Sequence, residues 1–122
     1  MKILMLGDVM GVSGRKAINN NLETIIDKNE IDFTVVNGEN AADDGRGITG
    51  AIAENFFSIG VDVITSGNHI WDKKETIDYI NQESRLLRPA NLAEGSPGRG
   101  FEIYATKNKK FNVGVINLMG NV

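Results

Sequence analysis

Three short apolar segments, each followed by a glycine and then a polar side chain, recur along the first part of the chain. They are Ile3–Leu6, Phe33–Asn37 and Val61–Ser66. The polar positions that follow them, 8, 39 and 68, are separated by 31 and 29 residues, which is close to one strand–helix–strand unit of about 30 residues. Short continuous apolar runs of this kind are typical of buried parallel strands. The spacing therefore predicts a parallel β-sheet.

Amphipathic segments follow each of these strands. The first covers about residues 13–28, and we expect Ser13 to cap it. The second covers residues 48–60 and ends at Gly60, a residue type common just beyond a helix end. The third opens at Asp72, and Glu75 three residues later completes a pattern like a capping box. The alternation of strand and helix predicts an α/β fold with parallel strands and right-handed crossovers.

The pattern changes after Pro89. Residues 101–106 and 111–118 are predicted to be strands, and the polar segment 107–110 between them predicts a β-hairpin. No internal repeat or linker interrupts the sequence, so we expect residues 1–122 to form a single domain.

Composition excludes several classes of protein. The 122 residues carry a formal net charge of −3, so we expect no strong nucleic-acid surface. The chain has no cysteine and one histidine, which excludes thiolate metal sites and any zinc site built on several histidines of this chain. No apolar segment approaches the ~20 residues that cross a bilayer, and we expect a cytoplasmic protein without a membrane partner.

The polar side chains that follow the three strands form the candidate site. The carboxyl ends of parallel strands meet at one edge of a sheet, where open α/β folds bind their ligands. Asp8, Glu39, Asn40, Asn68 and His69 should therefore converge there. Carboxylate and amide oxygens bind hard divalent cations, and a carboxylate between two metals suits phosphoryl chemistry. The alternative for each residue alone is a helix cap or an Asx turn.

Other familiar site patterns fit less well. The first glycines have the spacing G-x-x-x-G-x-x-G, which is not the dinucleotide-binding pattern, and the chain has no phosphate-binding G-K-[ST] motif. Ser66 stands near His69, but adjacent residues of one extended turn cannot supply a nucleophile, a base and an orienting group together. A serine hydrolase is therefore not expected.

Longer blocks of sequence point to one family. They are Gly7–Asp8, Val36–Ala42, Gly45–Thr49, Ser66–Asp72 and Leu87–Asn91. These blocks resemble the YmdB-like family of bacterial calcineurin-type metallophosphoesterases, and the resemblance covers essentially the whole chain. It implies a metallophosphoesterase-like sandwich, with four αββα layers in the complete family and the N-terminal parallel-sheet half in this chain.

The resemblance also implies a chemistry and a role for each site residue. The family hydrolyses phosphodiesters, with 2′,3′-cyclic nucleotides as favoured small-molecule substrates, at a centre of two metal ions, most often iron or manganese. Asp8 would bind one metal, Glu39 would bridge both, Asn40 would be a further ligand, and Asn68 would bind the second metal. His69 would face the phosphate and assist the leaving group.

The family differs from this chain in length. Its members are roughly twice as long, and their C-terminal half supplies three more histidine ligands, so we expect these 122 residues to correspond to the N-terminal half and to be inactive alone. Such a half would expose apolar surface, and we expect it to form a homo-oligomer. The alternative function is a non-catalytic α/β module that binds a nucleotide or a protein.

Overall fold

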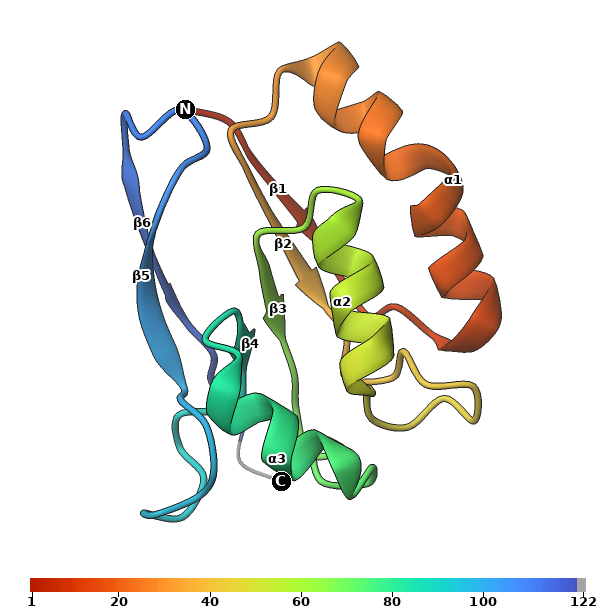
Figure 1. Ribbon diagram of the computed structural model, residues 1–122, viewed down its shortest axis with the longest axis vertical. Helices are drawn as coiled ribbons and strands as arrows, with labels where there is room; N and C mark the ends of the chain where they lie inside the picture. Colours follow the sequence, from red (N-terminus) through yellow and green to blue (C-terminus); the bar gives the residue numbers. More distant parts are fainter. Residues whose placement is uncertain (121–122) are drawn as a thin grey trace.

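The computed structural model describes residues 1–120 and has three layers (Figure 1). The elements in chain order are β1 (Ile3–Leu6), α1 (Gly11–Asn29), β2 (Phe33–Asn37), α2 (Gly50–Ser58), β3 (Val63–Thr65), α3 (Glu75–Gln82), β4 (Leu86–Leu87), β5 (Phe101–Ala105) and β6 (Asn112–Ile116). Helices cover one face of a four-stranded sheet, and the β5–β6 hairpin lies on the other face. The predicted α/β fold with a parallel sheet is confirmed.

The central sheet has the strand order β1-β2-β3-β4, and every pair is parallel. The register places Ile3 beside Phe33 and Val35 beside Val63. Strand β4 was not predicted from the sequence, because a strand of two residues carries no periodicity of its own. Its residues, Leu86 and Leu87, are fully buried, so packing against β3 holds them in the sheet.

Two apolar clusters hold the layers together. The cluster on the helix side joins Leu22 of α1 and Phe56 of α2 to Val36 and Ile64 of the sheet. The cluster on the other side joins residues of β2, β3 and β4 to the hairpin, mainly Phe33, Val35, Val63, Leu87 and Val113. Both faces of β2 and β3 are therefore buried, which explains why these strands read as continuous apolar runs.

Two predicted helix starts are wrong. Helix α1 begins at Gly11, after Met10, and no side chain caps it; Ser13 lies inside the first turn. Helix α3 begins at Glu75, after Lys74, and again no side chain caps it; the Asp72 carboxylate contacts a ring nitrogen of His69.

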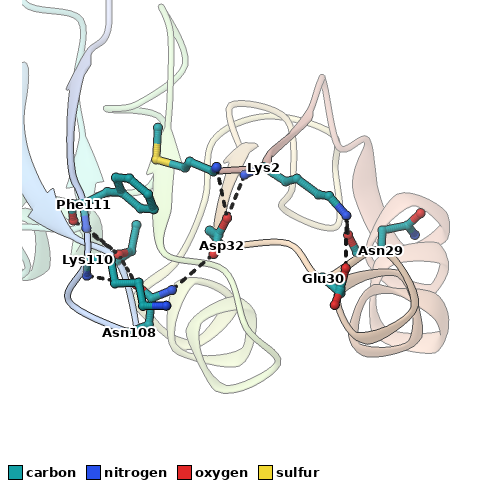
Figure 2. A network of polar contacts seen from close by, with 9 residues as sticks. Lys2, Asn29, Glu30, Asp32, Asn108, Lys110 and Phe111 are labelled. Carbon is teal, nitrogen blue, oxygen red and sulfur yellow. Dashed lines mark hydrogen bonds and ion pairs between the residues drawn. The ribbon is translucent and has the colours of Figure 1, made fainter.

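The predicted hairpin is confirmed and is tied to the start of the sheet by polar contacts (Figure 2). Asp32 accepts a hydrogen bond from the backbone N–H of Lys2 at 2.7 Å and another from the Asn108 side chain at 3.3 Å. Asn108 also accepts from the backbone N–H of Lys110 at 3.0 Å within the turn. One carboxylate therefore joins β1, β2 and the hairpin turn at the end of the sheet opposite the candidate site.

The outer face of the hairpin is apolar and exposed. Phe101, Ile103 and Ile116 are between 61% and 68% exposed, whereas Val113 and Tyr104 point inward. Whether the chain forms a homo-oligomer stays a prediction. Within residues 1–120, no helix combines the length and the apolar character that a membrane crossing requires.

Asp62 gives a test of the β2–β3 pairing. Its carboxylate accepts a hydrogen bond from the Thr34 N–H at 2.7 Å, and its own N–H donates to the Thr34 carbonyl at 2.9 Å. Burial raises the pKa of Asp62 above its ordinary value of 3.8. A raised pKa favours the neutral folded form, so this contribution to stability is present below 3.8 and is lost as the pH rises through the folded-state pKa.

Asp62→Asn keeps an oxygen that can accept from Thr34 and removes the titration. We expect the unfolding free energy of the wild type, relative to that of Asp62→Asn, to decrease as the pH is raised from about 3 to about 7. Urea unfolding curves across this range measure it. A difference that increases with pH would show that the folded site favours the carboxylate, contrary to this account.

Candidate metal centre

Backbone hydrogen bonds continue past the ends of the parallel strands and bring the next residues of each strand together. The Val9 N–H donates to the Asn37 carbonyl at 3.1 Å, and the Gly38 N–H donates to the Thr65 carbonyl at 2.9 Å. The segments after β1, β2 and β3 are therefore held side by side at one edge of the sheet. Asp8, Glu39 and Asn68 all lie at this edge.

Asp8 and Asn40 are in direct contact. The side-chain amide of Asn40 donates to the Asp8 carboxylate at 2.7 Å, and the Asn40 carbonyl accepts from the Gly11 N–H at 2.8 Å. The backbone of Asp8 is left-handed, with φ at 43°, a conformation that costs a non-glycine residue energy and that clusters at functional sites. The contact leaves the side-chain oxygen of Asn40 and one Asp8 oxygen free to bind a ligand.

Glu39 reaches across to the segment after β3. A Cβ atom added to Gly67 would stand 2.0 Å from one carboxylate oxygen of Glu39 and 2.5 Å from the other. The carboxylate therefore occupies the space that any side chain at position 67 would need. This close approach explains the glycine that precedes Asn68, because only a residue without a side chain fits there.

Asn68 and His69 form a third group with Asp72. His69 Nδ1 lies 2.9 Å from Asp72 Oδ2, and Asn68 Nδ2 lies 3.4 Å from His69 Nε2. The sequence analysis assigned Asp72 to a helix cap, because its spacing from Glu75 fits that motif equally well. The acidic residue three positions after the histidine is the sequence signal that could have predicted this contact.

The glycine-rich loop after β2 supports the same edge from the helix side. Gly47 has φ at 77°, and a Cβ there would lie 2.9 Å from the backbone oxygen of His69. Ion pairs fasten the loop, with Arg15 of α1 bound to Asp43 and Lys73 bound to Asp44 at 2.7 Å. The two ion pairs hold the loop in place, and its Gly47 lies close to the backbone of His69.

Buried polar groups fix the end of β3 from the hairpin side. The Ser66 hydroxyl donates to the Leu87 carbonyl at 2.7 Å and is buried, which agrees with its rejection as a nucleophile. Asn117, which the sequence analysis missed, donates from its side-chain amide to the carbonyls of Ser66 and Leu87 at 2.9 and 3.1 Å. No sequence pattern marks Asn117, because its role depends on how the hairpin packs.

The donor set suits a hard cation. Asp8 and Glu39 supply carboxylate oxygens, and Asn40 and Asn68 supply amide oxygens, which are the ligands that magnesium, manganese and similar ions accept. No cluster of three or more histidine, cysteine, aspartate or glutamate side chains occurs within residues 1–120. Four oxygen-donor residues fit part of a metal shell, but they fall short of the four to six ligands that each of two metals normally takes.

Proteins of known sequence and structure are similar to this chain over nearly its whole length. The family described as YmdB-like protein matches residues 4–122. The chain belongs to the YmdB-like family. This is a family of the metallophosphoesterase type.

Individual proteins match the same part of the chain. A protein of Bacillus subtilis named 2′,3′-cyclic-nucleotide 2′-phosphodiesterase is 43% identical over 98% of the chain. A crystal structure of a hypothetical protein from Thermus thermophilus superposes with a TM-score of 0.87 at 33% identity, and that of a phosphatase from Mycoplasma pneumoniae with 0.85 at 32%, each over 98% of the chain. The chain spans 44% of the Bacillus subtilis relative and 45% and 43% of the two structures.

The contact between Glu39 and Gly67 gives a test of the site. Gly67→Ala would force the Glu39 carboxylate away from the segment after β3, since the new Cβ would overlap its oxygen. We expect at least about a tenfold loss of Mn²⁺ affinity, equivalent to about 1.4 kcal/mol. Isothermal titration calorimetry measures the affinity.

Gly7→Ala is the matched control. It adds the same methyl group beside Asp8, where a Cβ would meet nothing within 4 Å. We expect Gly7→Ala to bind Mn²⁺ like the wild type. Equal losses in both variants would mean that the Glu39 position does not determine metal binding.

Proposed function

We propose that this chain provides the N-terminal half of a dinuclear-metal phosphodiesterase that hydrolyses 2′,3′-cyclic nucleotides or related phosphodiesters. The observation that carries the proposal is the convergence of three strand ends, where Asn40 contacts Asp8 and the Glu39 carboxylate packs on Gly67. Family membership and the name of the Bacillus subtilis relative support the same reaction.

Each metal-binding side chain has a role that follows from its place. Glu39 lies between the segments after β1 and β3, so its carboxylate is the group that can bridge two ions. Asp8 and Asn40 would hold one ion on the β1 side, and Asn68 would bind the other at the end of β3. Iron or manganese suits these ligands when imidazole is added to them. When bound, the metals neutralise charge on the phosphate and supply the nucleophile at neutral pH.

His69 acts on the substrate in this proposal. Its Nδ1 is engaged by Asp72, which leaves Nε2 beside Asn68 to face the phosphate. With both ring nitrogens protonated, Nε2–H would hydrogen-bond the leaving ribose oxygen and donate its proton to that oxygen as the P–O bond breaks. A positioned acid of this kind contributes about 10²–10⁴ in rate.

Substitutions separate these two roles in a complete enzyme. A suitable form joins the 122 residues to the C-terminal part of the Bacillus subtilis relative that the match leaves out. Glu39→Gln should lower both metal content and activity, because a neutral amide bridges two cations poorly.

His69→Ala should lower turnover by about 10²-fold or more and leave the metal content nearly unchanged. Metal analysis and a cyclic-nucleotide assay measure both. Loss of metal in His69→Ala would make His69 a ligand, against this proposal.

The 122 residues alone should have little activity. They supply two carboxylates and two amides for two ions, and an open, hydrated site weakens the electrostatic stabilisation of phosphoryl transfer. We expect turnover with added Mn²⁺ to be far below that of the fusion protein. Equal turnover per molecule would show that the additional ligands are dispensable. Absence of both metal binding and activity in the fusion protein would favour a non-catalytic module.

A further inference from the structure

We infer that Arg15 is a positioning residue for the candidate metal centre, because its guanidinium holds the backbone that carries Asn40 and so keeps the Asn40 amide against Asp8. The catalytic meaning of this inference rests on the proposed function, but the arrangement itself does not. It depends on the contacts that the first turn of α1 makes with the segment after β2.

The first turn of α1 binds two successive backbone carbonyls beside the site. The Gly11 N–H donates to the Asn40 carbonyl at 2.8 Å, and Arg15 Nη1 donates to the Ala41 carbonyl at 2.5 Å. Ala41 is fully buried, and a carbonyl group in a buried segment needs a hydrogen-bond donor. The two peptide groups that follow the Asn40 Cα atom are therefore held by α1.

The same turn also contacts the segment after β1. Gly14 packs on Val9, and a Cβ atom added to this glycine would lie 3.1 Å from a methyl carbon of Val9. Val9 directly follows Asp8, whose carboxylate accepts from the Asn40 side-chain amide at 2.7 Å. The first turn of α1 therefore sets the positions of both residues in this contact, and a shift of the Asn40 backbone would pull the amide away from Asp8.

A guanidinium suits this task because it presents several donors in one fixed plane. While Nη1 binds the Ala41 carbonyl, Nη2 donates to the Asp43 carboxylate at 2.5 Å. The Arg15 side chain is 19% exposed and that of Asp43 is 79% exposed. An ion pair with so exposed a partner adds little to stability. The Asp43 carboxylate orients the guanidinium, and the carbonyl contact holds the backbone.

Lys73 provides a matched comparison on the same loop. Its ammonium binds the Asp44 carboxylate at 2.7 Å, and its side chain is 24% exposed, close to the value for Arg15. Lys73 therefore fastens the loop by an ion pair of similar burial, but its partner is a side chain and not the backbone beside Asn40. If Arg15 serves only to fasten the loop, loss of either cation should have the same effect on Asn40.

Proton exchange of the Asn40 side-chain NH₂ with water measures the inference in the metal-free, ¹⁵N-labelled chain. Arg15→Met keeps an apolar stem and removes both donors. We expect it to speed the exchange by about tenfold, as for the loss of about one hydrogen bond that holds the closed form. Arg15→Lys, whose single ammonium can still reach the carbonyl, should give an intermediate rate. Lys73→Ala and Asp43→Asn should exchange like the wild type.

The comparison with Lys73→Ala decides the inference. An Asn40 exchange rate in Arg15→Met equal to that in the wild type, or an equal increase in Lys73→Ala, would overturn it. If Arg15→Met does not fold, Arg15→Lys is measured in its place: exchange faster than in Lys73→Ala supports the inference, and equal exchange overturns it. Because neither metal nor substrate is present, failure here is distinct from failure of the proposed function.

Discussion

Parallel pairing of β1, β2 and β3 is the constraint on which the rest of the molecule depends. It sends all three strand ends to one edge of the sheet, and backbone bonds from Val9 and Gly38 continue the alignment past the strands. Residues 8, 39 and 68 are therefore brought together by the strand pairing, although they lie far apart in the sequence. The helices bury one face of these strands and the hairpin buries the other, so the edge rests on a rigid support.

The edge is organised by short polar contacts, each of which leaves an oxygen atom free. Asn40 donates from its NH₂ group to Asp8, and the NH₂ group of Asn68 lies 3.4 Å from His69 Nε2. Both amides therefore keep their oxygens for a ligand. Glycine at position 67 makes room for the Glu39 carboxylate. A site that gathers unpaired oxygens in this way is suited to a hard cation.

Much of this arrangement could be predicted from the sequence, because buried parallel strands leave a strong pattern. Strand β1 and strand β2 occur where their apolar runs predicted them, and the hairpin follows its polar turn. The failures share a physical cause: β4, the start of α3 and the role of Asn117 are all set by tertiary contacts. Asp72 shows this most clearly, since a capping box and a histidine partner have the same local spacing, and only the folded turn decides between them.

We propose that the ends of three strands form one cation-binding edge. Addition of Mn²⁺ to the ¹⁵N-labelled chain tests it, because the paramagnetic ion broadens amide signals near its binding site. We expect the signals of Asp8, Glu39 and Asn68 to broaden together at low Mn²⁺, while those of Asp62 and Lys107 at the opposite end of the sheet stay sharp. Broadening centred on another acidic stretch, with the three strand-end signals unaffected, would contradict it.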